Sequence, residues 1–287
     1  MNQFLTTIGK AISKLNPNEV RAIAEKPVHV GIAAEHEFRK AEMRRFLLED
    51  GMSKERMLES AQHIHQIDPA MLVPQFDVDL FEQGIGTPKH GFTFYPGDID
   101  RTVAQILDKK EELGLPLARQ FPVFRPFVVD KIISGICQEN AMFAVATSLP
   151  GVIPGLSLPL AAGEFASDTA ILTMNQMRMA FMLAAASDRA IGYGEQKSEI
   201  ASVIAGAFGW RAVARELVGK IPFGGGIVPK AAISYAGTWV VGKSLERLYR
   251  FGHGYSRQER HQIYDQGLER GRKVAAKLLD KVRGKAS

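Results

Sequence analysis

The chain has 287 residues, 46% of them hydrophobic and 23% charged, so it can bury one large core or two modest ones and is not an intrinsically disordered protein. Its single cysteine, Cys137, excludes an internal disulfide framework and a multi-cysteine metal site, and the apolar sequence around it predicts a buried thiol. The formal net charge is +5, and residues 243–287 carry 12 Lys/Arg against 5 Asp/Glu, so the basic character belongs to the C-terminal tail.

Residues 1–24 are predicted to form an amphipathic N-terminal helix and a linker. The opening MNQFLTTIGKAISKL lacks a continuous apolar stretch and a cleavage site, so we expect no secretory signal. Phe4, Ile8 and Leu15 recur at helical spacing, and Pro17 follows the helix. Such a helix can dock on the protein or lie on a membrane surface, and the sequence leaves both open.

Residues 25–122 are predicted to form a small α/β domain. Short strands are expected in VHVGIAA, FDVDLF and GFTFYP, with helices at residues 35–50, 54–66 and 98–114. Ser53 is the expected N-cap of the second helix. The alternation in FDVDLF predicts a half-exposed strand with Asp77 and Asp79 on its solvent side.

The sequence offers no recognisable catalytic or metal-binding motif. No G-x-x-x-x-G-K-[ST] follows the first strand, and the acidic Glu35 and Glu37 there would repel phosphate. His63 and His65 are two apart on a predicted helix, so they would point to different faces and not share a metal. We therefore expect no enzymatic activity and assign no catalytic, cofactor-binding or metal-binding residue.

Residues 123–255 are predicted to form a domain of two apolar helical hairpins, each interrupted by proline and glycine. Between Glu139 and Glu164 lie 24 residues without Asp, Glu, Lys or Arg, a length that could cross a bilayer. Prolines inside this stretch exclude one straight helix. The expected hairpin breaks contain Pro150, Gly151, Pro154, Pro222, Gly224, Gly225, Gly226 and Pro229.

The glycine triplet at 224–226 is not followed by Lys-Ser/Thr, so it predicts a turn between helices and not a phosphate loop. Pro229 is expected in the first turn of the helix that follows. Polar residues that stand among the apolar helices are the candidates for an interaction or packing site: Asn175, Gln176, Arg178, Arg215 and Thr238. They could either bond to one another and fix helix packing, or contact a ligand.

Residues 256–287 are predicted to form a basic helix that begins with a capping box, Ser256 to Glu259. Its Lys and Arg residues would suit the surface of an anionic membrane, although a solvated charged helix has the same pattern. Nucleic acid is a disfavoured partner because the tail has no interleaved stacking aromatics.

Residues 138–250 resemble the domain of unknown function 697 family, the YcjF-like helical domain found behind Era-type GTPase domains. The resemblance rests on LPG at 149–151, NQMRM at 175–179, GAFGWRAVAREL at 206–217, IPFGGGIVPKAA at 221–232 and AGTWVVGKSLERLY at 236–249. It implies a membrane-associated protein without established enzymatic activity, in some members linked to stress responses. Because this chain has no phosphate loop, a GTPase partner would be a separate chain.

Together these patterns predict a mainly α fold, with a C-terminal domain of two Pro/Gly-broken apolar hairpins preceded by a small α/β segment. The expected function is that of a non-enzymatic membrane-associated protein that partners a GTPase or another membrane-surface protein. We expect it at a bacterial inner membrane with cytoplasmic termini. The sequence is compatible with a homo-oligomer. A soluble helical interaction module is the alternative, favoured by the mean hydropathy of −0.06. An uncharacterised enzyme is a second alternative.

Overall fold

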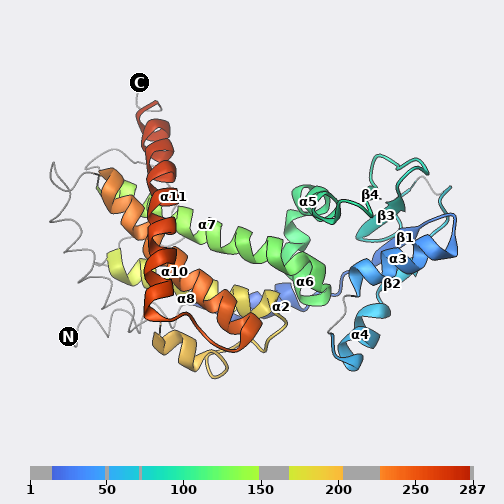
Figure 1. Ribbon diagram of the computed structural model, residues 1–287, viewed down its shortest axis with the longest axis horizontal. Coiled ribbons are helices and arrows are strands. Elements are labelled where there is room, and N and C mark those ends of the chain that lie inside the picture. Colours follow the sequence, from blue (N-terminus) through green and yellow to red (C-terminus); the bar gives the residue numbers. More distant parts are fainter. Residues whose placement is uncertain (1–14, 49–51, 71–72, 149–167, 203–226, 285–287) are drawn as a thin grey trace. The chain divides into compact units, whose positions relative to one another are not determined.

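A computed structural model describes residues 15–48, 52–70, 73–148, 168–202 and 227–284 (Figure 1). The chain divides into two compact units. A helical unit contains residues 1–18, 131–184 and 191–287, and an α/β unit contains residues 19–130 and 185–190. The fold is mainly helical with a small sheet in the N-terminal part, as the sequence predicts.

The α/β unit is built on a four-stranded parallel sheet with the strand order β2-β1-β3-β4. The strands are β1 (Val30–Ala33), β2 (Ile64–Gln66), β3 (Val78–Glu82) and β4 (Phe92–Phe94). The helices of this unit are α2 (Pro17–Ala24), α3 (Glu37–Leu47), α4 (Lys54–Ala61), α5 (Ile99–Lys109) and α6 (Gly114–Gln120), with 3-10 turns at Glu111–Leu113 and Pro122–Phe124. The helix α7 (Arg125–Ala146) begins here and continues into the helical unit.

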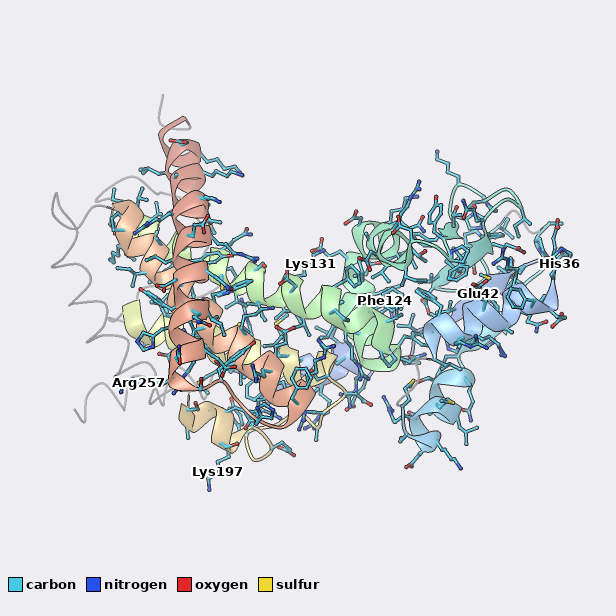
Figure 2. All side chains as sticks on the ribbon, in the orientation of Figure 1. His36, Glu42, Phe124, Lys131, Lys197 and Arg257 are labelled. Atoms are coloured by element: carbon cyan, nitrogen blue, oxygen red, sulfur yellow. The ribbon has the colours of Figure 1, made fainter. Side chains whose placement is uncertain are left out.

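Local side-chain caps stand at the starts of α4 and α5. The Ser53 hydroxyl accepts a hydrogen bond of 3.2 Å from the Arg56 N–H, which confirms the predicted cap of α4. Asp98 accepts one of 3.0 Å from the Arg101 N–H at the start of α5. The core beside the sheet is aromatic: the Phe46 ring lies 5.3 Å from Phe94 and 6.2 Å from Phe124, which is labelled in Figure 2.

Two sequence predictions fail in this unit. The helix expected to run to residue 66 ends at Ala61, and Ile64–Gln66 forms the strand β2. Ile64 is buried where it pairs with Val30, so burial against the sheet outweighs the helical pattern of the preceding residues. His63 and His65 are therefore not on one helix, and their rings lie 4.8 and 5.2 Å from the His29 ring.

The strand β3 is also not half-exposed. Asp79 is 3% exposed, and its carboxylate accepts hydrogen bonds from the N–H groups of Gln75 and Phe76, at 2.8 and 3.1 Å. Asp77 accepts a bond of 2.9 Å from the His29 N–H. Asp79 therefore orders the loop that enters β3, and Asp77 ties this loop to the residue before β1. The alternation of apolar and acidic residues alone does not reveal these roles.

The helical unit contains the rest of α7 together with α8 (Asp168–Ala186), α10 (Ile227–Phe251) and α11 (Arg257–Gly284). The helix α8 is buried on most sides, and Met174, Met177 and Met179 are each at most 2% exposed. These methionines are therefore part of the core of this unit. Cys137 of α7 is buried, as predicted.

The helices α10 and α11 form an antiparallel hairpin (Figure 1). Gly252 ends α10 with φ +79°, a left-handed conformation that glycine adopts without strain, and α11 opens with the predicted capping box. The Ser256 N–H donates to Glu259 at 2.7 Å, and the Glu259 N–H donates to the Ser256 hydroxyl at 3.3 Å. A Cβ added at Gly271 would stand 2.8 Å from the Ala232 carbonyl oxygen, so this glycine permits the close approach of the two helices.

Most of the predicted hairpin breaks lie outside the described residues: Pro150, Gly151, Pro154, Pro222, Gly224, Gly225 and Gly226. Pro229 is described and stands in the first turn of α10, as predicted. Across the described parts of the chain, none of the helices is both long enough and apolar enough to cross a bilayer.

Candidate functional site

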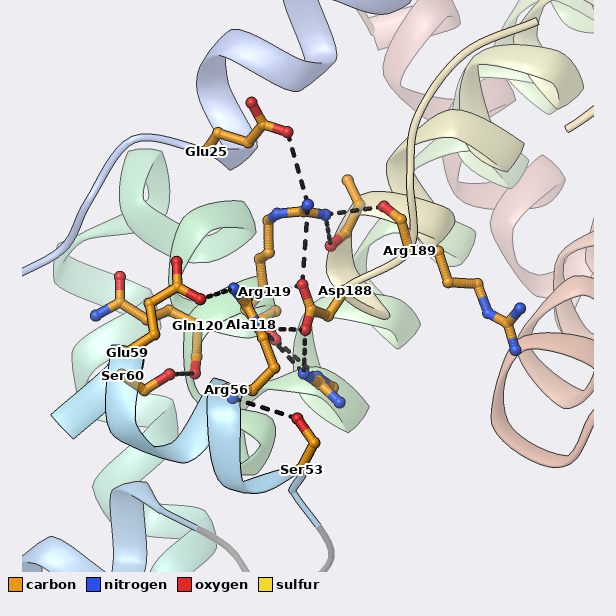
Figure 3. A network of polar contacts seen from close by, with 12 residues as sticks. Glu25, Ser53, Arg56, Glu59, Ser60, Ala118, Arg119, Gln120, Asp188 and Arg189 are labelled. Carbon is orange, nitrogen blue, oxygen red and sulfur yellow. Dashed lines mark hydrogen bonds and ion pairs between the residues drawn. The ribbon is translucent and has the colours of Figure 1, made fainter. Parts of the chain in front are cut away.

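A carboxylate two residues beyond the end of α8, that of Asp188, is the centre of an ion-pair network in the α/β unit. Asp188 has φ +55°, the left-handed region that Asp tolerates better than most residues. Its two oxygens bind Arg56 in a bidentate pair, with Nε at 2.7 Å and Nη2 at 2.7 Å (Figure 3). Such a fork fixes the direction of both side chains as well as their separation.

Two further arginines face the same carboxylate. Nη2 of Arg119 lies 3.8 Å from Asp188, and Nη2 of Arg125 lies 4.0 Å from it. Arg119 also donates through Nη1 to the Arg189 carbonyl at 2.9 Å. We call Asp188, Arg56, Arg119 and Arg125 the Asp188 clamp. It holds the short segment 185–190 within the α/β unit, because all three arginines come from residues 19–130.

Backbone contacts hold the clamp arginines in place. Arg56 stands in the first turn of α4, which Ser53 caps. Arg125 donates through Nε to the Ala118 carbonyl at 2.9 Å, across the junction between α6 and α7. The Ser60 hydroxyl donates to the Gln120 carbonyl at 2.9 Å and ties α4 to α6. The clamp is thus assembled on helix ends whose positions are set by local bonds.

A polar pocket of about 340 Å³ adjoins the clamp. Gln120 forms one wall and bonds to both backbone groups of Val28, at 3.1 and 2.9 Å. The lining of the pocket is mostly polar, with basic, acidic and neutral groups: Ala24, Glu25, Lys26, Pro27, Arg56, Glu59, Ser60, His63, Arg119 and Gln120. A pocket of this size and polarity can take a small charged ligand.

Three histidines converge beside this pocket. Nδ1 of His29 lies 2.9 Å from Nε2 of His65, so one ring must donate and the other accept. The His65 ring stacks on Phe76 at 4.3 Å. Burial and the neighbouring His29 lower the pKa of His63, and the same two causes lower the pKa of His65. Among the described residues, no group of three His, Cys, Asp or Glu side chains is arranged to hold a metal ion.

The carboxyl ends of β1 and β3, where open α/β sheets commonly bind ligands, hold an internal carboxylate. Glu82, the last residue of β3, accepts a hydrogen bond of 3.1 Å from the Glu35 N–H. It also pairs with Nε of Arg39 at 3.2 Å. An acidic side chain of the protein therefore contacts the amide at the start of α3, where a phosphate-binding relative would place its ligand.

In the helical unit, three of the sequence-predicted candidates share one hydrogen-bond network. Asn175 donates to the Asn140 side chain at 2.7 Å, and Asn140 donates to the Thr238 hydroxyl at 2.8 Å. Gln176 reaches the same hydroxyl at 3.5 Å. Asn140 is fully buried, and Asn175 and Thr238 are 7% and 1% exposed. This Asn140 network joins α7, α8 and α10 through neutral groups that satisfy one another.

The other two candidates lie apart from the Asn140 network. Arg178 forms an ion pair with Glu139 of α7, on a part of the surface where its side chain is 30% exposed. Arg215 lies outside the described residues.

Sequence reasoning missed Asn140 and the whole Asp188 clamp. Asn140 had a usable signal, since it is an amide at the head of an uncharged stretch, where a polar group needs a partner. Asp188 had none, because its three arginine partners lie 63 to 132 positions earlier in the chain and no spacing connects them.

Comparisons of this chain with family models, with curated proteins and with solved structures found no match.

Proposed function

We propose that the protein is a non-enzymatic, membrane-surface protein that attaches through its C-terminal helix. The observation that carries this proposal is the division of α11 into two faces. One face packs on α10: Tyr264, Gly267, Gly271, Ala275 and Leu279 are buried along it. The exposed surface between residues 270 and 281 is basic: Arg270, Arg272, Lys273, Lys277 and Lys281, against the single acid Asp280.

This charge is presented on a rigid support. Arg270 lies over the Trp239 ring at 4.4 Å, and Lys243 lies over the same ring at 5.3 Å. Because α11 is fixed to α10 by its buried stripe, the basic surface does not need to fold when it binds. Each Lys or Arg near an anionic bilayer contributes about 1 kcal/mol, so a cluster of this size can hold a protein at a membrane.

The partner and the compartment rest on the resemblance to the YcjF-like family. We propose that the protein serves a separate GTPase chain, or another membrane-surface protein, at the cytoplasmic face of a bacterial inner membrane. The contact between Glu82 and the Glu35 amide puts a negative charge near the start of α3, where a phosphate would bind. It therefore supports a GTPase that is a separate chain.

The test is cosedimentation of the full chain with vesicles. The probe vesicles contain phosphatidylglycerol and phosphatidylcholine, and vesicles of pure phosphatidylcholine serve as the reference. The triple variant Arg272→Gln, Lys277→Gln, Lys281→Gln should bind the anionic vesicles about 100-fold more weakly. A matched triple in the α/β unit, Arg45→Gln, Lys54→Gln, Lys89→Gln, makes the same charge change on exposed residues and should bind like the unaltered protein. Equal loss in both triples would show a nonspecific charge effect and refute the proposal.

A soluble helical interaction module is the second candidate, and the burial of α8 favours it. The most apolar residues of this helix are buried in the core of the unit. Its buried Asn175 side chain is hydrogen-bonded to Asn140. In the vesicle experiment, this candidate predicts that the unaltered protein stays in the supernatant with both kinds of vesicle.

A further inference from the structure

The pocket beside the Asp188 clamp presents donors that the protein itself does not use fully. The donors of Arg56 are used within the protein, because it binds Asp188 in a bidentate pair and Glu59 through Nη1. Arg119 is different. Its Nη2 has carboxylate oxygens of Glu25 and Asp188 only at 3.6 and 3.8 Å, which is longer than a hydrogen bond. A closer anion would therefore gain a charge-assisted bond that neither carboxylate makes.

A second observation comes from another wall of the same pocket. Nδ1 of His63 is buried and has no hydrogen-bond partner among the described residues. A buried ring nitrogen without a partner costs free energy, and His63 lines the pocket, so a turn of the ring that brings Nδ1 to a ligand there would gain a hydrogen bond. Lys26 adds an exposed positive charge at the rim.

We propose that this pocket binds a small anion with a phosphate or carboxylate group, held by Arg119 and His63 and attracted by Lys26. The volume of about 340 Å³ suits a small metabolite. Glu25 and Glu59 also line the pocket and are 51% and 58% exposed, so they oppose ligands of high charge such as nucleoside triphosphates. The pocket thus selects a ligand of low negative charge.

The test follows the histidine ring signals of the full chain by NMR while inorganic phosphate or acetate is added, with chloride at equal ionic strength as the reference. Binding should shift the His63 signals saturably and raise the pKa of that ring, because an adjacent anion favours the imidazolium. The His36 signals should not follow the same curve, since His36 lies outside the pocket. Saturation by phosphate alone or by acetate alone identifies the preferred anion, and no saturable shift with either would overturn the proposal.

Two variants and a control locate the site. Arg119→Gln should weaken binding more than tenfold, because it removes the charge-assisted donor. Lys26→Ala, which changes an exposed side chain and leaves the Asp188 clamp intact, should weaken it about fivefold. Lys54→Ala makes the same change on the exposed surface of α4 outside the pocket and should bind as the unaltered protein does. If Lys26→Ala and Lys54→Ala bind equally well, the anion is not in this pocket.

Discussion

The two units of this protein stabilise buried or half-buried polar groups by opposite means. In the α/β unit, one carboxylate gathers three arginines at a site where the side chains are 16% to 31% exposed. In the helical unit, neutral amides and hydroxyls bond to one another with almost no exposure. The difference follows from solvent access. A charge that keeps part of its hydration can be paired at modest cost, whereas a charge in a dry helix core costs several kcal/mol.

The comparison also separates two kinds of sensitivity. A charged, half-exposed network responds to salt and pH, because screening and protonation change its strength. A neutral buried network responds mainly to the loss of a partner, because the group left behind has no water to bond to. Four predictions test this contrast.

The largest effect is expected from Asn140→Leu in the helical unit. The change removes the acceptor of Asn175 and the donor to Thr238, and should lower the free energy of unfolding by about 3 kcal/mol. Denaturant unfolding followed by tryptophan fluorescence measures it, since Trp239 lies in α10 of this unit.

The triple variant Asn140→Leu, Asn175→Leu, Thr238→Val tests what the Asn140 network is for. Replacing the three buried members of the network by apolar groups should recover most of the lost stability if the network only fixes packing. A triple variant as unstable as the single one would mean that the polar groups do more than satisfy one another.

A smaller effect is expected from Asp188→Asn in the α/β unit. Asn keeps the left-handed backbone available, so the substitution isolates the charge. Three arginines would then lack their shared anion, and the free energy of unfolding should fall by about 2 kcal/mol, between the values for exposed and buried pairs. Hydrogen exchange of the backbone amides of β1 and β3 measures the loss in this unit, and high salt should reduce the difference. A salt-independent loss would contradict the electrostatic account of the clamp.

The smallest effect is expected from the histidine cluster, which should make the free energy of unfolding depend on pH. Burial and His29 lower the folded-state pKa of His63 and His65 below 6.5, so the unfolded chain takes up protons more readily. The stabilising contribution is complete above about pH 6.5 and is lost as the pH falls through the lowered pKa values. Thermal unfolding between neutral and mildly acidic pH measures it, and His65→Phe should flatten the profile. Glu59 and Arg44 also face the cluster, where Glu59 opposes the lowering of the pKa of His63 and Arg44 adds to the lowering of the pKa of His65.

Features decided by neighbouring residues could be predicted from the sequence. The capping box at Ser256, the cap at Ser53 and the proline in the first turn of α10 all depend on contacts within four positions. The start of the C-terminal helix follows from the same short-range rules.

Features decided by distant residues could not be predicted. A three-residue strand such as β2 is too short to show its own periodicity, and only its pairing with β1 identifies it. The sequence pattern predicts Asp79 at the surface, because the loop whose N–H groups it binds is not visible in the sequence. The candidates Asn175 and Thr238 were found as polar groups in apolar helices, but Asn140, which connects them, and the Asp188 clamp emerged only from the fold.

The strands at the two edges of the sheet, β2 and β4, are each only three residues long. An edge strand exposes unpaired backbone groups on which a foreign chain can add a strand, and its danger grows with its length. Edges this short offer few such groups in register. The sheet therefore presents a poor template for the strand-to-strand aggregation that threatens small α/β units when they are crowded together.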